Sequence, residues 1–251
     1  MASGEFCWVE LSTPDKASAL AFYSGLFGWQ ALELEIGLKG EPFSYALVRS
    51  GGRDVAAVYQ MLAEQVKHGV PSRWLPYVGV DSVDPVLRAA ETLGATCLVD
   101  PVDVYQSGRM AILEDPTGAT FALWQPKSMV GFQVEDQPGS AAAFELHTGD
   151  ARRAGAFYGK LFGWASADGV LTKGKRTVAD LRELAPGATP RWETCFAVAS
   201  CATSCQRAQG AGARLAEPPA DRAGLGCRAT LVDPQGATFC LVEQRPPGRG
   251  H

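Results

Sequence analysis

Hydrophobic residues near the start of the chain follow first a strand period and then a helix period. Residues 6–13 alternate, with Val9 and Leu11 on one side and Trp8 and Glu10 on the other, which predicts a strand. The next stretch has its apolar residues at helical spacing, namely Ala19, Phe22, Tyr23 and Leu26. Asp15 is suited to cap the start of this helix and Gly28 to end it.

The same order of elements then continues along the chain. Further strands are predicted at 43–49, 54–61, 75–80, 96–99, 109–114 and 119–124, with a second helix at 85–93. The repeating unit is β-α-β-β-β and is predicted to occur four times. Strands joined by Asp-Pro-x-Gly turns favour an α+β fold with curved mixed sheets over a doubly wound parallel sheet.

The chain contains an internal duplication. Residues 12–29 (STPDKASALAFYSGLFGW) and 147–164 (HTGDARRAGAFYGKLFGW) are identical at ten of eighteen positions, and DPTGATFAL at 115–123 matches DPQGATFCL at 233–241. We therefore predict an N-terminal domain at 1–126, a linker at 127–142 and a C-terminal copy at 143–251. The offset between matches falls from 135 to 118, so the intervening segment is 17 residues shorter in the copy.

These motifs carry a family resemblance. CWVELSTPDKASALAFYSGLFGW, SGRMAILEDPTGATFALWQP and their second copies resemble the vicinal oxygen chelate superfamily, the glyoxalase/bleomycin-resistance/dioxygenase group, in its two-domain actinobacterial branch. The resemblance implies tandem glyoxalase-like domains, each of two βαβββ modules that form a cup for a small ligand. Most metal-using members hold a divalent ion there through His, Gln or Glu.

The family's ligand positions can be transferred to this chain one by one. They fall at Trp8, Leu75 and Ala122 in the first repeat and at Ala143, Glu193 and Cys240 in the second. The three residues of the first repeat cannot coordinate a metal, and the second repeat offers only two donors, whereas a catalytic site needs about three protein ligands. We therefore expect no metal and no other cofactor.

Two carboxylates are the leading candidates for chemistry. Glu10 and Glu145 each follow the former ligand position by two residues, so they share its side of the strand. An unpaired carboxylate on an apolar wall has a raised pKa and can act as a general base. We interpret Glu10 as catalytic with Arg109 as its partner in substrate binding; the alternative is a structural ion pair between them. Glu145, Glu193 and Cys240 are candidates in the second cup, Cys240 either as a nucleophile or as a small buried residue.

Aromatic and apolar residues are predicted to line the first cup. They are Trp8, Trp74, Leu75, Tyr77, Ala122 and Trp124. Such a wall suits a flat aromatic or polyketide-like ligand. The alternative is that these side chains fill the cup.

Composition narrows the classes of partner. The net charge is −4 with basic residues scattered singly, which argues against nucleic acid, and no apolar run approaches the ~20 residues of a membrane helix. The seven cysteines include no C-x-x-C pair, and no leader pattern is apparent, so we expect reduced thiols in a cytoplasmic monomer or homodimer.

Together these observations predict a metal-independent protein of secondary metabolism. It would bind and transform a small aromatic or polyketide-like metabolite in the N-terminal cup, as a lyase, isomerase or hydrolase. Two alternatives stay open: a non-catalytic protein that sequesters a drug or metabolite, and a metal-dependent glyoxalase-like lyase or dioxygenase.

Overall fold

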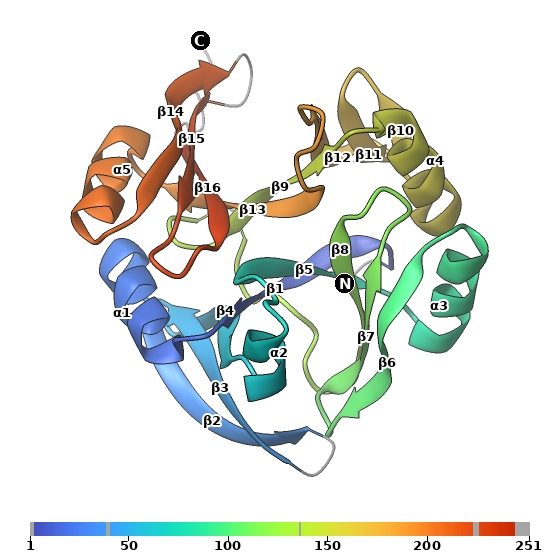
Figure 1. The fold of residues 1–251 in the computed structure, drawn as a ribbon, viewed down its shortest axis with the longest axis horizontal. Helices are drawn as coiled ribbons and strands as arrows, with labels where there is room; N and C mark the ends of the chain where they lie inside the picture. The colour runs from blue at the N-terminus through green and yellow to red at the C-terminus, as the bar shows by residue number, and fades with distance from the viewer. Residues whose placement is uncertain (1–2, 39–40, 136, 223–225, 244–251) are drawn as a thin grey trace. The chain divides into compact units, whose positions relative to one another are not determined.

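Two mixed sheets, one from each repeat, organise the chain. The computed structural model describes residues 3–38, 41–135, 137–222 and 226–243 (Figure 1). The first sheet has the strand order β2-β3-β4-β1-β5-β8-β7-β6, and the second has the order β10-β11-β12-β9-β13-β16-β15-β14. The two orders are equivalent, which confirms the predicted α+β fold built from tandem copies of two βαβββ modules.

The first repeat holds eight strands and three helices within its described residues. The strands are β1 (Glu5–Thr13), β2 (Gln30–Leu38), β3 (Glu41–Ser50), β4 (Arg53–Gln60), β5 (Arg73–Gly79), β6 (Thr96–Val104), β7 (Gly108–Glu114) and β8 (Thr120–Pro126). The helices are α1 (Lys16–Phe27), α2 (Ala63–Lys67) and α3 (Val83–Thr92). Neither β2 nor α2 is among the elements predicted from the sequence.

The second repeat follows the same plan in shorter form. Its strands are β9 (Ala141–Thr148), β10 (Ala165–Ala167), β11 (Val170–Lys173), β12 (Arg176–Glu183), β13 (Arg191–Val198), β14 (Arg214–Arg222), β15 (Gly226–Val232) and β16 (Thr238–Glu243). Its helices are α4 (Ala151–Phe162) and α5 (Cys201–Gly210). The β10–β11 hairpin has strands of 3 and 4 residues where β2 and β3 have 9 and 10, which accounts for much of the 17-residue deficit.

The repeated motif at the start of α1 and α4 has the same local structure in both copies. The Asp15 side chain accepts from the backbone N–H of Ser18, and Asp150 does the same for Arg153, at 3.0 and 2.8 Å. Gly28 and Gly163 end the helices with φ of 72° and 74°, a left-handed conformation that favours glycine. The predicted capping residues are therefore confirmed.

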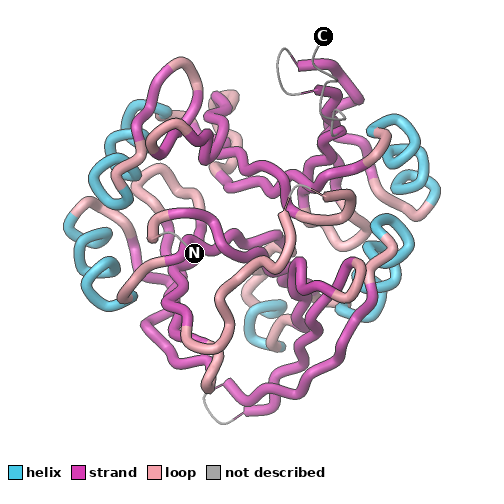
Figure 2. The backbone as a smooth tube through the Cα atoms, turned by 180° about the vertical axis from the view of Figure 1, so that it is seen from behind, coloured by secondary structure: helices cyan, strands magenta, loops and turns pink. Residues whose placement is uncertain are grey.

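Contacts divide the chain into two compact units that do not coincide with the two repeats. The first unit consists of Met1–Trp8, Leu75–Gly131 and Ala143–Glu193, and the second of Val9–Trp74, Phe132–Ala142 and Thr194–His251. Each unit therefore combines one module of the first repeat with one module of the second. In the first unit α3 packs beside α4, and in the second α1 packs beside α5 (Figure 2).

The repeated AFY and DP-x-G motifs meet inside these units. In the second unit the Tyr23 hydroxyl donates to Asp233 at 2.9 Å and accepts from the Trp74 indole N–H at 2.9 Å. In the first unit Tyr158 donates to Asp115 at 2.8 Å and accepts from Trp192 at 2.8 Å. The tyrosine, aspartate and tryptophan that both repeats share therefore lie in the core of each unit.

A bilayer-spanning helix is not found in the part of the chain that the structure describes.

Candidate functional site

Strand register determines which side chains share a face of the second sheet. Side chains two residues apart on a strand point to the same side, so Glu145 and His147 lie on one face of β9. Their Cα partners on the parallel strand β12 are Asp180 and Arg182. The opposite face of β9 carries Phe144, which stacks on Phe6 with ring centroids 4.0 Å apart. One face of β9 is therefore apolar and the other is charged.

A group of five charged or titratable side chains, which we call the charged cluster, occupies that second face. Its members are Glu145 and His147 from β9, Arg182 from β12, and Arg191 and Glu193 from β13. His147 Nε2 lies 3.2 Å from Glu145 Oε2 and 3.7 Å from Glu193 Oε2. The same two carboxylate oxygens accept from Arg182 Nε at 3.3 Å and from Arg191 Nη2 at 3.0 Å. All five residues belong to the first compact unit.

The carboxylates of this cluster are deeply buried. Glu145 and Glu193 are 2% and 1% exposed, and His147 is 6% exposed. Removing two carboxylates from water costs several kcal/mol each unless opposite charge compensates for it, and one guanidinium contacts each of them here. Asp180 borders the cluster; burial raises the pKa of its carboxyl, and the charge of Arg182 partly offsets this. Buried charge of this density is typical of binding or catalytic sites.

The corresponding face in the first repeat has a different chemistry. Glu10 is the counterpart of Glu145, but its Cα partner on β4 is Ala57 rather than an aspartate. The Tyr45 hydroxyl donates to Glu10 at 2.7 Å. Burial, and secondly the negative charge of Glu10, raises the pKa of the Tyr59 hydroxyl. The Glu10 carboxylate therefore lies among phenols, where Glu145 lies among charges.

Five of the six residues predicted to line the first cup lie on β5 and β8. Tyr77 is the Cα partner of Ala122 and Gly79 that of Trp124, so Leu75, Tyr77, Ala122 and Trp124 share one face. Tyr77 packs edge-on against Trp124 with centroids 6.3 Å apart. Trp8 of β1 is buried as well.

Trp74 is the exception among these predicted ligand-lining residues. It precedes Leu75 by one residue, so it points to the other side of β5. It is 2% exposed and packs edge-on against Tyr23 and Phe196, at centroid distances of 5.2 and 4.9 Å. The expectation that Trp74 lines the cup is therefore wrong, and Trp74 is a core residue.

Arg109 is placed differently from the predicted pairing with Glu10. Its guanidinium binds both oxygens of Asp84 at 2.9 and 3.0 Å and contacts Asp103 at 3.3 Å. The hydrogen bonds to Asp84 raise the pKa of Arg109 and lower that of Asp84. Arg109 therefore belongs to an ion pair on the surface of its own module.

Cys240 is a fully buried residue of β16. Its Cα partner on β13 is Cys195, and its Sγ accepts from Arg228 Nε at 2.9 Å. The predicted role of Cys240 as a nucleophile stays a prediction.

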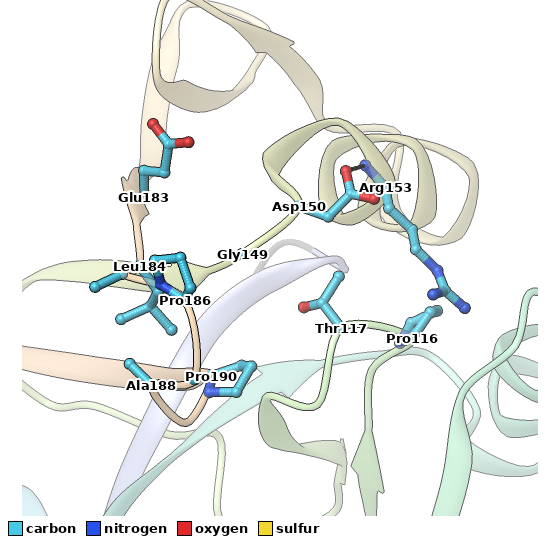
Figure 3. A pocket seen from close by; sticks show the side chains of 12 residues that line it. Pro116, Thr117, Gly149, Asp150, Arg153, Glu183, Leu184, Pro186, Ala188 and Pro190 are labelled. Atoms are coloured by element: carbon cyan, nitrogen blue, oxygen red, sulfur yellow. Dashed lines mark hydrogen bonds between the residues drawn. The ribbon is translucent and has the colours of Figure 1, made fainter.

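A surface cavity of about 520 Å³ lies in the first compact unit, apart from the charged cluster (Figure 3). Three prolines, Pro116, Pro186 and Pro190, line it. Glu183 stands on one wall and Arg153 beside Asp150 on the other, so these charged groups do not converge on a common point (Figure 3). We assign no function to this cavity.

Comparison with known proteins identifies the family to which the chain belongs. Residues 6–123 match the sequence profile of the glyoxalase/bleomycin resistance protein/dioxygenase superfamily, and residues 143–242 match that of a glyoxalase-like domain. The chain is 36% identical to the anthracycline biosynthesis protein DnrV of Streptomyces peucetius over 264 residues, covering 97% of this chain and 94% of DnrV. The chain belongs to the glyoxalase/bleomycin resistance protein/dioxygenase superfamily.

Solved structures of this superfamily share the fold at low sequence identity. The Mn(II)-bound glyoxalase from Novosphingobium aromaticivorans superposes with a TM-score of 0.65 at 15% identity, over 96% of this chain and 82% of that one. The 2,3-dioxygenase LapB from Pseudomonas sp. KL28 gives a TM-score of 0.64 at 11% identity, over 98% and 94%. At this level of identity the similarity concerns the fold alone.

Metal binding in this superfamily led us to test whether the charged cluster fits an ion. One donor atom from each of Glu145, His147 and Glu193 lies within 4.8 Å of the other two. Ligands at ~2.1 Å from a tetrahedral ion lie ~3.4 Å apart, close to the 3.2 and 3.7 Å measured from His147 Nε2 to the two carboxylate oxygens. The donors therefore fit a divalent ion in number, type and spacing.

His147 is the functional candidate that sequence reasoning missed. The superfamily ligand position on this strand falls at Ala143, and His147 stands four residues later on the same strand face. Extending the alternation that selected Glu145 by two residues would have found it. The position of Arg182 beside His147 depends on the register between β9 and β12, which the sequence does not specify.

Proposed function

We propose that the first repeat binds a flat, fused-ring aromatic metabolite and that Glu10 transfers a proton to or from it without a metal. The observation that carries the proposal is the carboxylate of Glu10 held by the Tyr45 hydroxyl at 2.7 Å beside the Tyr59 phenol, all three within the second compact unit. The superfamily ligand positions of the first repeat hold Trp8, Leu75 and Ala122, none of which can coordinate an ion. Proton transfer at this site therefore depends on side chains of the protein.

The proposed ligand class follows from the side chains at this site. Aromatic rings stack on the faces and edges of tyrosine side chains such as Tyr45 and Tyr59, and such contacts add ~0.5–1.5 kcal/mol beyond the burial of apolar area. Tyr59 supplies a second phenol beside Glu10. DnrV, which is 36% identical, is named for anthracycline biosynthesis, and anthracyclines as a class are fused-ring aromatic polyketides. This name supports the same ligand chemistry for the present chain.

The mechanism needs only two side chains. Glu10, when ionised, accepts a proton from an acidic position of the ligand, such as a phenol or a carbon next to a carbonyl. The Tyr45 hydrogen bond orients the carboxylate. Return of the proton to another position of the ligand completes an isomerisation.

Binding and proton transfer can be tested separately. A hydroxyanthraquinone should bind and quench protein fluorescence, and anthrone should exchange its acidic CH₂ hydrogens with solvent deuterium faster in the presence of the protein, as followed by NMR under nitrogen. Glu10→Gln should slow this exchange by ~100-fold while it changes hydroxyanthraquinone affinity less than ~3-fold.

Glu145→Gln is the matched control, because Glu145 occupies the equivalent position in the second repeat. It should leave both measurements unchanged. Hydroxyanthraquinone binding without any Glu10-dependent exchange would instead support the alternative of a non-catalytic binding protein. Absence of binding would reject the proposed ligand class.

A further inference from the structure

The charged cluster of the second sheet carries an inference that is independent of the proposed aromatic site. We propose that Glu145, His147 and Glu193 form a binding site for a divalent first-row transition metal ion. Two of these ligands, Glu145 and His147, lie two and four residues beyond Ala143, the position that the superfamily register would use. Glu193 occupies a superfamily ligand position, so the site combines one residue in the superfamily register with two that lie outside it.

The position of the donors on rigid strands favours this assignment. Glu145 and His147 project from the same face of β9, and Glu193 projects from β13. Their donor atoms lie within 4.8 Å of one another without any rearrangement of the backbone. A preorganised set of this kind loses little side-chain entropy when an ion binds, because burial already restricts the three side chains.

The two arginines are suited to the second shell of such a site. Carboxylates that bind metals are in most cases also hydrogen-bonded, and these bonds orient the ligand oxygens. Arg182 and Arg191 provide these hydrogen bonds to Glu145 and Glu193. Arg182 Nη2 is buried and has no hydrogen-bond partner among the described residues, so a donor is available for an anion beside the ion.

The first repeat provides an internal comparison. At the positions equivalent to Glu145, His147 and Glu193 it has Glu10, Ser12 and Leu75. Both repeats have a carboxylate at this position of their first strand, Glu10 and Glu145. Only the second repeat also has the histidine and the second glutamate that complete the set of donors. The two repeats are therefore predicted to differ in metal binding.

The donor types limit the class of ion. Imidazole suits Mn, Fe, Co, Ni and Zn, whereas two carboxylates favour the harder members of that series. Mn²⁺ is a convenient probe because the six-line electron paramagnetic resonance signal of the free ion disappears on binding. This readout does not depend on any activity.

The experiment titrates the full-length protein, stripped with chelator, with Mn²⁺ alone. We expect one equivalent to bind, with a matching rise in melting temperature, because an ion that binds only the folded state stabilises it. His147→Gln and Glu193→Gln should each weaken binding at least ~10-fold, and Glu10→Gln should not change it. Arg191→Gln should weaken binding by ~10–100-fold, because it removes the hydrogen bonds that orient the Glu193 oxygen.

Several results would overturn the proposal. Absence of stoichiometric Mn²⁺ binding to the wild-type protein would show that the cluster is only a buried ion-pair network. Binding that survives His147→Gln, or that is lost in Glu10→Gln, would place the ion elsewhere. Hydroxyanthraquinone binding by the chelator-stripped protein should persist, so failure of the metal site is distinguishable from failure of the proposed function.

Discussion

The hydroxyl of Tyr23 donates a hydrogen bond to the carboxylate of Asp233, 2.9 Å away in space and 210 residues away in sequence. Both groups are buried, Tyr23 completely and Asp233 with 4% exposure. The equivalent pair, Tyr158 and Asp115, lies in the other compact unit at 2.8 Å. Each unit is therefore held by one tyrosine and one aspartate that come from different repeats.

Loss of either hydroxyl should destabilise the protein. Tyr23→Phe and Tyr158→Phe each remove a donor to a buried carboxylate and an acceptor for a tryptophan N–H, at a cost of ~1–3 kcal/mol. Urea unfolding followed by circular dichroism measures this cost. Tyr105→Phe is the control, because Tyr105 is 60% exposed and its substitution should change the free energy of unfolding by less than ~0.5 kcal/mol.

The cost of Tyr23→Phe should depend on pH. Burial raises the pKa of Asp233 above its usual 3.8, and the hydrogen bond from Tyr23 acts in the opposite direction. A raised pKa in the folded state means that the contribution of Asp233 to stability is most favourable below about pH 3.8 and is lost as pH rises through the folded-state pKa. Removal of the Tyr23 hydroxyl raises that pKa further and enlarges the loss. The difference in unfolding free energy between wild type and Tyr23→Phe should therefore be larger near pH 7 than near pH 4, and a constant difference would contradict this linkage.

Gly108 on β7 makes room for the indole ring of Trp124. A Cβ at Gly108 would lie 2.4 Å from Trp124 Cζ2 and 2.7 Å from the backbone oxygen of Gln125. Gly108→Ala should therefore displace Trp124 and cost ~1–3 kcal/mol, seen as a lower urea midpoint and a shifted tryptophan emission. Gly25→Ala in α1 is the opposite case: nothing lies within 4 Å of its Cβ, and the helix should gain up to ~1 kcal/mol. Equal effects of the two substitutions would contradict the close approach.

Arg109→Gln tests the role predicted for this arginine from the sequence. Its side chain is 25% exposed and that of its partner Asp84 is 43% exposed, so solvent screens the pair and Arg109→Gln should change the free energy of unfolding little. Because the guanidinium is bound to Asp84 and Asp103, we expect anthrone exchange and hydroxyanthraquinone affinity to change less than ~2-fold. A large loss of affinity at unchanged stability would restore Arg109 as a substrate anchor.

The fold could be predicted to a large extent because repetition made the signal redundant. Two copies of Tyr-containing helices and Asp-Pro-x-Gly turns located four modules, and the caps at Asp15 and Gly28 were correct. Trp74 was misplaced because an error of one residue in a strand moves a side chain to the other face. The second compact unit could not be foreseen, since nothing in sequence similarity states that the first module packs against the fourth, the most distant along the chain, rather than against the second.

The candidate site was predicted only in part for a related reason. Alternation on one strand is a local property, and it grouped Glu10 with Trp8 on one side of β1. The charged cluster depends on the register between β9 and β12, which pairs Arg182 with His147. Such pairing is decided by long-range packing, so Glu145 and Glu193 were found singly and their arrangement with the arginines was not.

The composition of the second compact unit also bears on how the chain is made. Val9–Trp74 and Thr194–His251 belong to the same unit, and about 120 residues separate these segments. At ~5–20 residues per second, a ribosome needs roughly 6–24 s to supply the missing partner. During that interval the apolar face of α1, including Tyr23, has been synthesised but has no native surface to pack against. Nascent chains stalled just before Thr194 should therefore expose this face to trigger-factor-type chaperones, and release should follow once Asp233 has left the exit tunnel.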